Sequence, residues 1–517
     1  MKSRFSLFPS FCRDAKQWFV SGPRWRILTC GILVVSGVFA TFALIASSNS
    51  HAPTEHRIDS QAKFDELREA RFVPGDVIYL QRGKRFKGMF APRGSGTKEA
   101  PIILKAYGEG PRPRIDAGGW NQAGLRLKNV QWWEVSGLEI TNTNGSDIDQ
   151  GDLFGIYVLI ENREGIFRHI HIDDCDVHDV NGKVAGKRRG GIHVHVLECL
   201  NTWIDDLRIT NNRVTDIGGV GIGNESSCAS VEILPDDEIT KNLWTKVYVA
   251  GNFVDQTGRN SVIARASKDA VYEYNTLANS SRYDTGHSIF CFNTDGIRIQ
   301  HNEAYGNVGE EEKDRGGFDA DYNCVNTLIQ YNYSHDNMWF CGIMKRPNRN
   351  VVIRYNISQN ERKGLYFYGF DTELDAQNIH IYNNTHFTGR GLKPYVFPEN
   401  RTPINTLFEN NIFYFEEVGL WTSQSQGINT SFNNNLYYNL EPFPGDSNAI
   451  TLNPQFVQPG EAGTNIDLTT MEDLLGYHLE TQSPAIDQGK SIEMPEDPKD
   501  FFGSPLKGDG VNLGAVE

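Results

Sequence analysis

One short phrase returns throughout the second half of the chain. It is an Asn at the head of a small polar turn, usually after an aromatic residue and before a hydrophobic, strand-like run. Successive copies lie 23 to 30 residues apart, and their marker residues are Asn252, Asn275, Asn302, Asn332, Asn356, Asn383, Asn411 and Asn435. A unit of this length that repeats many times is typical of a solenoid, in which each repeat contacts only its neighbours.

The runs between the markers are short and rich in Val, Ile, Phe and Tyr, with Gly, Asn and Asp between them. This is the composition of strands and turns, and the signatures of leucine-rich, ankyrin and tetratricopeptide repeats are absent. We therefore predict an all-β fold, a parallel β-helix whose coils each rise by about 4.8 Å. Equivalent residues would then stack, and the repeated Asn residues would form a structural column of hydrogen-bonded amides.

The repeat array leaves little room for a second domain, and we assign residues 59–440 to the β-helix. Residues 60–70 have helical spacing, with Phe64 and Leu67 on one face, so a short helix is expected to cover the open end of the stack ahead of coils that begin near Pro74. The last segment, 441–517, is predicted to be a C-terminal cover of the β-helix.

The N-terminus resembles a membrane signal-anchor. Residues 27–46 carry no charge and are long enough to cross a bilayer as a helix, which needs about 20 residues. Residues 1–26 are basic, so they are expected to stay in the cytoplasm while the rest is exported. Residues 47–58 would be a polar tether. We predict a membrane-anchored protein with its domain on the periplasmic or extracellular side; the alternative is cleavage of the segment and secretion.

Net charge and cysteine content exclude some classes of function. The formal charge of −15 argues against a nucleic-acid binder. Two Cys residues, Cys12 and Cys30, precede the predicted exported domain, and the other six show no paired CxxC spacing, so no zinc site of that type is predicted. Cys291 alternates with Phe290 and Phe292 and is expected to point into the coil.

Three blocks carry a resemblance to a known group of proteins. They are GDVIYLQRG with APIILKAYGEGPRPRIDAGG, the central GGFDADYNCVNTLIQYNYSHDN, and the closing SPAIDQG with GAVE. Together they resemble bacterial right-handed parallel β-helix proteins of the pectate-lyase superfamily over nearly all the chain after residue 70. That superfamily includes polysaccharide lyases, uronate epimerases, glycoside hydrolases and adhesins. The central block is most similar to β-helix glycoside hydrolases that include α-L-fucosidases and xylanases.

Strand alternation predicts which side chains leave the core, because successive side chains point to opposite faces. The runs around residues 193, 265, 291, 320, 345 and 367 would together form one outward lane. Exposed rings beside charged groups suit a sugar polymer, since pyranose faces lie on rings and hydroxyls bond to charged groups. The residues predicted to bind substrate in this lane are His193, His195, Arg265, Phe290, Phe292, Arg346, Tyr366 and Tyr368.

The candidate catalytic residues are Asp319, Asp321 and Glu361. Asp319 and Asp321 are two apart on a strand, roughly 6.5 to 7 Å along its axis. Inverting glycosidases hold their carboxyl groups about 6.5 to 9.5 Å apart, and mutual repulsion with partial burial would keep one group protonated. The resemblance to the hydrolases makes Glu361 a candidate partner of Asp321. The alternatives for the Asp pair are a calcium site and a structural role. No other cofactor is predicted, and His193 and His195 lack a third metal ligand.

The sequence thus predicts an enzyme that hydrolyses glycosidic bonds of a polysaccharide or oligosaccharide. Two alternative hypotheses stay open beside hydrolysis. Arg265 and the Lys345–Arg346 pair could neutralise a uronate carboxylate, as a polysaccharide lyase or uronate C5-epimerase requires. The third hypothesis is a non-catalytic glycan-binding solenoid.

Overall fold

The structure is a computed structural model that describes residues 53–145, 151–181, 186–231, 241–309, 314–344, 348–369, 376–397, 403–421, 427–493, 499–506 and 510–517. The chain divides into two units, Met1–Ser50 and His51–Glu517, and the described residues all belong to the second. The predicted cytoplasmic segment 1–26 and membrane span 27–46 lie outside the described residues. Within the described ranges, no helix is long and apolar enough to cross a membrane.

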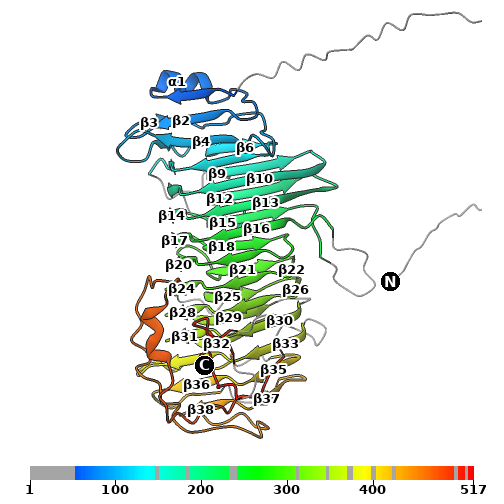
Figure 1. Ribbon diagram of the computed structural model, residues 1–517, viewed down its shortest axis with the longest axis vertical. Helices are drawn as coiled ribbons and strands as arrows, with labels where there is room; N and C mark the ends of the chain where they lie inside the picture. The colour runs from blue at the N-terminus through cyan, green and yellow to red at the C-terminus, as the bar shows by residue number, and fades with distance from the viewer. Residues whose placement is uncertain are drawn as a thin grey trace, which may run out of the picture. The chain divides into compact units, whose positions relative to one another are not determined.

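Three parallel sheets build the unit His51–Glu517 (Figure 1). We call the three sheets I, II and III in the order in which most coils pass through them. One coil, for example, contains β10 (Gly165–Asp173) of sheet I, β11 (Asp176–Val180) of sheet II and β12 (Gly190–Leu197) of sheet III, after which the chain returns to sheet I one level further on. Strands of equivalent place pair in parallel, with registers such as Ile170↔Leu207 and His193↔Gly223. This is a β-helical solenoid, as the repeat predicted.

Each sheet takes one strand from most coils. The strands of sheet I are β1 (Glu55–Ile58), β2 (Val77–Gln81), β4 (Ile102–Tyr107), β7 (Trp133–Ser136), β10 (Gly165–Asp173), β13 (Thr202–Thr210), β16 (Thr245–Ala250), β19 (Val271–Glu273), β23 (Arg298–Gln300), β27 (Leu328–Gln330), β30 (Asn348–Arg354), β33 (Ala376–Tyr382), β35 (Thr406–Glu409) and β37 (Ser431–Asn433), with β22 (Thr294–Asp295) and β26 (Cys324–Val325) beside them. Those of sheet II are β3 (Arg85–Lys87), β5 (Arg114–Asp116), β8 (Glu139–Asn142), β11 (Asp176–Val180), β14 (Arg213–Ile217), β17 (Phe253–Thr257), β20 (Thr276–Ala278), β24 (Glu303–Tyr305), β28 (Tyr333–His335), β31 (Ile357–Gln359), β34 (Thr385–Thr388), β36 (Ile412–Phe415) and β38 (Leu436–Tyr438). Those of sheet III are β6 (Ala123–Lys128), β9 (Phe154–Glu161), β12 (Gly190–Leu197), β15 (Val220–Ser226), β18 (Val262–Arg265), β21 (Ile289–Phe292), β25 (Gly316–Ala320), β29 (Trp339–Met344) and β32 (Gly364–Gly369).

A short helix covers the N-terminal end of the stack, as predicted. Helix α1 (Gln61–Leu67) begins at Ser60, whose side chain accepts a hydrogen bond from the Lys63 N–H. Its apolar face buries Phe64 and Leu67, and Phe64 stacks on Phe86 at 5.2 Å between ring centroids. The coils do not begin near Pro74 or at residue 59, and the end of the predicted tether 47–58 is a strand of the first coil. Strand β1 lies ahead of the helix and pairs in register with β2, because its fully buried Ile58 completes the core at this end.

Buried Asn side chains stack where the chain turns from sheet I into sheet II. In each step the Oδ1 of one Asn accepts hydrogen bonds from both the backbone N–H and the Nδ2 of the Asn one coil earlier, at 3.0 and 2.9 Å for Asn275 on Asn302. The same amide donates to a backbone carbonyl, as Asn302 does to Tyr272 at 2.9 Å. This Asn column contains Asn212, Asn252, Asn275, Asn302, Asn332, Asn356, Asn384, Asn411 and Asn435, all buried.

The Asn column confirms the predicted structural role of the repeated Asn, with one correction. Asn384, not Asn383, belongs to it. Asn383 has a φ of 49° and holds the left-handed position that Tyr355 holds one coil earlier, so it forms a parallel column with Asn410 and is one residue out of phase. The Asn column ends at Asp446, whose carboxylate accepts from the backbone and side chain of Asn435.

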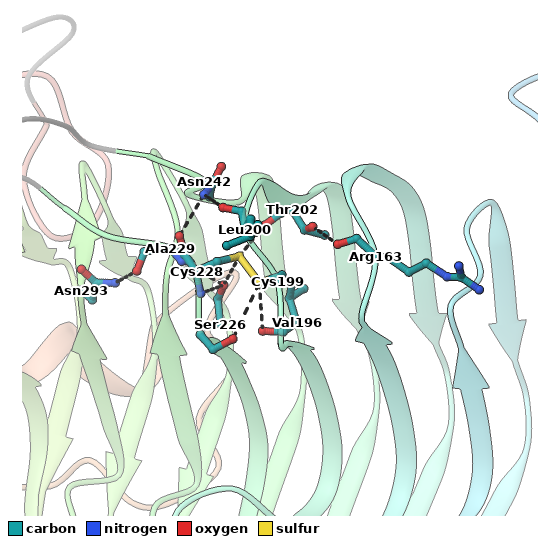
Figure 2. Close-up of a disulfide and its surroundings, with 11 residues drawn as sticks. Arg163, Val196, Cys199, Leu200, Thr202, Ser226, Cys228, Ala229, Asn242 and Asn293 are labelled. Carbon is teal, nitrogen blue, oxygen red and sulfur yellow. Dashed lines mark hydrogen bonds between the residues drawn. A yellow bond between two sulfur atoms is a disulfide. The ribbon is translucent and has the colours of Figure 1, made fainter.

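A disulfide joins two neighbouring coils of sheet III. Cys199 and Cys228 follow the ends of β12 and β15, and their Cα atoms are 5.7 Å apart (Figure 2). The Nδ2 of Asn242 donates to the carbonyls of Leu200 and Cys228 beside it (Figure 2). Cys291 lies in the core, as predicted.

The C-terminal segment covers a flank as well as an end. A bridge between Leu436 and Ile450 continues the last coil, after which the chain returns along sheet II (Figure 1). The 3₁₀ helix η1 (Glu472–Tyr477) packs there, with Tyr477 and its neighbours against Tyr333, Ile357 and Phe387 of β28, β31 and β34. The segment predicted as a cover therefore buries apolar outer residues of sheet II.

We expect Asn302→Ala to lower the free energy of unfolding by roughly 2 to 4 kcal/mol. The substitution removes the oxygen that accepts hydrogen bonds from two buried donors of Asn275. Each buried donor left without a partner costs about 1 to 3 kcal/mol. Denaturant unfolding followed by circular dichroism measures the change. The matched control is Asn448→Ala, an exposed Asn that should change stability by about 0.5 kcal/mol or less. Equal effects of the two substitutions would contradict the structural role of the Asn column.

Candidate active site on the outer face of sheet III

The strand register places most of the predicted lane in two columns on the outer face of sheet III. The first column runs through His193, Gly223, Ile263, Phe290, Asp319, Gly342 and Phe367. The second runs through His195, Glu225, Arg265 and Phe292, and Asp321 continues it because its N–H donates to the Cys291 carbonyl one coil earlier. The residues between the columns, such as Val194, Ala264 and Ala320, lie in the core.

The predicted exposure of this lane is wrong, because loops that precede the strands fold over it. His193, Phe290 and Asp319 are all within 1% of fully buried. Lys187, from the loop before β12, places its ammonium 4.5 Å from the ring centroid of Phe290. Phe292 remains half-buried, and its ring stacks on Tyr322 at 5.3 Å. Phe292 and Tyr322 therefore present a partly exposed aromatic surface next to Asp321.

His193 and His195 are packing residues in this structure. His193 lies 5.5 Å from the ring of Phe154, and its Nε2 donates to the Val220 carbonyl at 3.3 Å. His195 lies beside the hydroxyl of Tyr157, 3.2 Å from its Nδ1. Burial lowers the pKa of His193 to about 3, so it stays neutral at physiological pH. The prediction that these rings contact substrate is not supported by their position under neighbouring side chains.

Tyr366 and Tyr368 point into the core, so their predicted contact with substrate is wrong. They pair in register with Cys341 and Ile343, which are core residues, whereas Phe367 pairs with Gly342 and faces out. Tyr366 places its hydroxyl 2.8 Å from the Nε2 of His386. This strand is hydrophobic on both faces, since Phe367 packs outside against Trp339 and Met344. The alternation of side chains therefore does not show which of its residues point into the core.

Glu361 is a structural group of the turn between sheets II and III. A second short column runs there, in which the backbone N–H of Asn307 donates to Asn337 Oδ1 and that of Asn337 donates to Glu361 Oε2, each at 3.0 Å. Ser334 donates to the other carboxyl oxygen. Glu361 thus takes the place of an Asn in a column and is buried, which favours a structural role. Its predicted role as catalytic partner of Asp321 stays a prediction. Arg346 and Lys345 lie outside the described residues.

Asp319 is the most buried acid of the outer face. Burial, followed by the nearby carboxylates of Asp321 and Asp314, raises its pKa well above the usual value, while Lys187 opposes the shift. Both carboxyl oxygens are buried, and within the described residues neither has a hydrogen-bond partner. A Cβ on Gly342 would lie 2.7 Å from Asp319 Oδ1, so this coil requires Gly where it passes the carboxyl group. Burial and the neighbouring carboxylates therefore favour the protonated form of Asp319.

His287 connects Asp319 with a third acid, Asp314. The backbone N–H of Gly316 donates to His287 Nδ1 at 3.0 Å, so a neutral ring carries its hydrogen on Nε2. That nitrogen is 3.5 Å from Asp319 Oδ2 and 3.7 Å from Asp314 Oδ1. Asp314 is the more accessible of the two, with 21% of its side chain exposed against 1% for Asp319. The two carboxyl groups therefore lie on either side of His287 Nε2, one buried and one partly exposed.

Positive charge balances the acids from two sides. Lys187 interacts electrostatically with Asp314, Asp321 and Asp319, and burial lowers the pKa of its ammonium. Arg265 lies 5.4 Å above the ring of Phe292 and pairs with Glu225 in its own column. The calcium ion considered from the sequence stays a prediction.

Sequence reasoning missed three members of this group: Asp314, His287 and Lys187. Asp314 and Lys187 lie in an acidic and a basic loop that look like solvated turns in the sequence. His287 precedes a strand by two residues and has no motif around it. The signal that could have found them is position, because each loop precedes a strand of sheet III by a few residues and must therefore open onto the same outer face.

Comparison with known proteins supports the fold and points to one group of enzymes. No family model matches the chain. A lacto-N-biosidase of Bifidobacterium longum subsp. longum is 27% identical over 553 residues, an alignment that covers 86% of this chain and 34% of that protein. The chain therefore spans about a third of the length of this curated relative.

Solved structures agree on the architecture. Two crystal structures of GH136 lacto-N-biosidase from Eubacterium ramulus, a selenomethionine derivative and the native protein, match with TM-scores of 0.59 and 0.56 and identities of 20% and 19%. The matches cover 68% and 73% of this chain and 66% and 67% of those chains. These neighbours are parallel β-helix proteins, so the resemblance found in the sequence is confirmed at the level of the fold.

We expect Glu361→Gln to act on stability and not on turnover. Burial raises the pKa of Glu361 to about 8, although hydrogen bonds from Ser334 and Asn337 oppose the shift. Since the folded pKa exceeds the unfolded one, the bound proton stabilises the fold at low pH, and this stability is lost as the pH rises through about 8, by up to about 1.4 kcal/mol per pH unit.

Unfolding measured at several pH values should therefore show a steeper loss for the parent than for Glu361→Gln between pH 5 and pH 8, with the variant the more stable of the two at pH 9. Turnover on any substrate of the parent is the second measurement. A loss of turnover by 100-fold or more with stability unchanged would instead restore the catalytic role predicted from the sequence.

Proposed function

We propose that this protein is a glycoside hydrolase that cleaves a glycosidic bond of an oligosaccharide or polysaccharide bound on the outer face of sheet III. The observation that carries the proposal is the group of three acids, Asp314, Asp319 and Asp321, on adjoining positions of one face. Its relative from Bifidobacterium longum is a lacto-N-biosidase, which is a glycoside hydrolase.

Hydrolysis of a glycosidic bond needs one carboxyl group that gives a proton to the leaving oxygen and one that stays ionised. A cluster of acids can hold both states at one pH, because burial and repulsion push their pKa values apart. In our proposal Asp314 and Asp321 are the catalytic residues. Asp314 is the most accessible of the three acids, and Asp321, although only 4% exposed, lies next to the half-buried rings of Phe292 and Tyr322, whereas Asp319 is fully buried. Asp319 is a positioning residue, whose retained proton limits the negative charge beside the other two.

Water enters the proposed reaction as the second reactant. The protonated catalytic carboxyl group gives its proton to the glycosidic oxygen as the bond to the anomeric carbon breaks, and water supplies the hydroxyl that this carbon gains. The water's proton returns to the cluster. Phe292 and Tyr322 would support a pyranose face beside Asp321, while Arg265 stays held by Glu225.

The location of the reaction is also a proposal. The disulfide between Cys199 and Cys228 fits an oxidising compartment outside the cytoplasm, where such bonds persist. The basic lead and apolar segment 27–46 fit export with an N-terminal anchor. We propose that the enzyme acts on the exported side of the membrane, on glycans outside the cytoplasm.

A second candidate function is supported by a cationic cavity on the same face. The second column continues towards the N-terminus through Leu159 and Lys128. The cavity there has a volume of about 600 Å³, and its basic lining residues are Arg71, Arg93, Arg126, Lys128 and Arg163. Arg93 pairs with Glu69 and Lys128 with Glu161, whereas the other three have no carboxylate partner within the described residues. An acidic glycan would fit it, as a lyase or uronate epimerase requires.

We expect Asp314→Asn and Asp321→Asn each to lower turnover by a factor of about 100 or more, the usual contribution of general acid–base catalysis. Asp319→Asn should cost less than about tenfold, because an amide resembles the protonated carboxyl group already present. Release of reducing ends from a panel of glycans, including substrates of lacto-N-biosidases, measures turnover. Asp59→Asn, exposed beside α1, is the control.

Three outcomes distinguish the roles. A 100-fold loss in Asp319→Asn would make Asp319 a catalytic acid, as predicted from the sequence. Full activity of all three variants on a substrate of the parent would overturn the site. New absorbance of an unsaturated uronate together with reducing ends would identify a lyase.

The cationic cavity gives a separate expectation. Arg126→Ala should weaken binding of uronate oligosaccharides at least tenfold, and the parent's affinity should fall between 50 and 200 mM salt because screening weakens exposed charge pairs. Isothermal titration measures both effects, with a neutral oligosaccharide of equal length as the control ligand. If acidic and neutral oligosaccharides bind equally, the second candidate function fails.

A further inference from the structure

Two imidazoles and two carboxylates converge on the outer face of sheet I, on three neighbouring strands. Glu134 comes from β7, His169 and His171 from β10, and Asp206 from β13. No step of the proposed hydrolysis uses them. We propose that this group is a binding site for one divalent transition-metal ion of the zinc class, with Glu134, His169 and His171 as ligands and Asp206 as their support.

The distances between the ligand atoms suit one ion. A ring nitrogen of His169, one of His171 and a carboxylate oxygen of Glu134 all lie within 4.8 Å of one another. Zinc bonds to nitrogen and oxygen are about 2.0 to 2.2 Å long, so ligand atoms around a tetrahedral ion are roughly 3.4 Å apart. Small side-chain rotations on a rigid sheet would bring the three atoms to that spacing.

Asp206 orients the first histidine in the manner of a metal site. Its Oδ2 is 2.8 Å from His169 Nδ1, which leaves His169 Nε2 as the ligand atom, 2.9 Å from Glu134 Oε1. Metal-bound histidines commonly give their other nitrogen to a carboxylate in this way. Asp206 is itself held by Arg208 at 3.1 Å, and Trp132 stacks on the His169 ring at 5.2 Å.

His171 supplies the second imidazole. Its Nε2 lies 3.0 Å from the same Asp206 oxygen, so this one carboxylate faces both imidazoles. The two rings lie 3.8 Å apart between centroids. Two imidazoles this close together, with a carboxylate beside each, form an arrangement that an ion bound between them would stabilise.

The backbone of sheet I bends at one position in four successive coils, where Trp132, His169, Asp206 and Lys246 all have a left-handed φ. His169 and Asp206 have φ values of 57° and 70° although both lie inside strands, where extended backbone is the rule. Such outliers re-aim side chains, and they persist where the surrounding structure holds them. The pairing of β10 with β13 continues on both sides of these residues, so the outliers are built into the sheet.

The donor set selects the class of metal. Calcium and magnesium prefer oxygen ligands, whereas two imidazoles with one carboxylate suit zinc and its transition-metal neighbours. The side chains of Glu134, His169 and His171 are 39%, 17% and 20% exposed, so an ion can enter from solvent and water can take a fourth position. The sequence signal was a His-x-His pair on a strand, followed one coil later by an acid.

The test uses the purified full-length chain without a polyhistidine tag, stripped with a chelator and titrated with Zn²⁺ against a fluorescent competitor. We expect one zinc bound per chain, and a 10- to 100-fold weaker affinity in His171→Ala, Glu134→Gln and Asp206→Asn. The matched control is His178→Ala, because His178 also lies between two carboxylates, Glu139 and Asp179, but has no second imidazole in its group. It should leave zinc affinity unchanged.

Absorption spectra of the unsubstituted chain with Co²⁺ give a readout that does not depend on how the variants fold. Tetrahedral coordination by nitrogen and oxygen should appear as visible bands that Zn²⁺ removes and that excess Ca²⁺ does not. The proposal is overturned if His178→Ala weakens zinc binding as much as His171→Ala does. It is also overturned if the cobalt spectra are those of the free ion, and the residues then form only histidine–carboxylate hydrogen bonds. Glycan turnover does not enter either measurement.

Discussion

The hydrogen-bonded Asn column is the interaction on which the other features depend. Each Asn in it gives two donors to the next amide and one to a backbone carbonyl, so adjacent coils are tied at one fixed point per turn. Because side chains alternate between faces, a slip of one residue would move an entire strand's core residues to the surface. By fixing the corner between sheets I and II, the Asn column also fixes which residues of sheet III stand side by side, including Phe290, Asp319 and Gly342.

The fold was predictable because its signal is periodic and polar. A buried amide whose partners are the amides of the neighbouring coils is costly to replace, so an Asn recurs at this position in coil after coil. The strands can then be predicted between successive Asn residues. Asn383 shows the limit of such a pattern: where two Asn residues are adjacent, the letters do not say which has the left-handed backbone. Glu361 shows another, since a carboxylate can take the place of an amide in a column and then looks like a lone surface acid.

The candidate site was less predictable because it depends on the paths of loops and on which alternate residues of each strand point outward. Alternation placed Asp319 and Asp321 on the outer face, where core residues between them set the phase. It failed at Tyr366, because aromatic residues there fill both faces of the strand. Nor could alternation reveal that the lane is covered, since Lys187 and Asp314 come from loops whose path has no period.

The two proposed sites use the solenoid in the same way. A sheet whose strands are held in register presents side chains from different coils at fixed spacing, so a chemical group can be assembled from single residues far apart in sequence. Glu134, His169 and Asp206 meet on sheet I in this way, as His287 and Asp319 do on sheet III. Keeping Asp319 buried without a hydrogen bond destabilises the fold, and so does a left-handed His inside a strand. Both can persist because the stabilising hydrogen bonds of the Asn column lie at another corner of the coil, where neither site disturbs them.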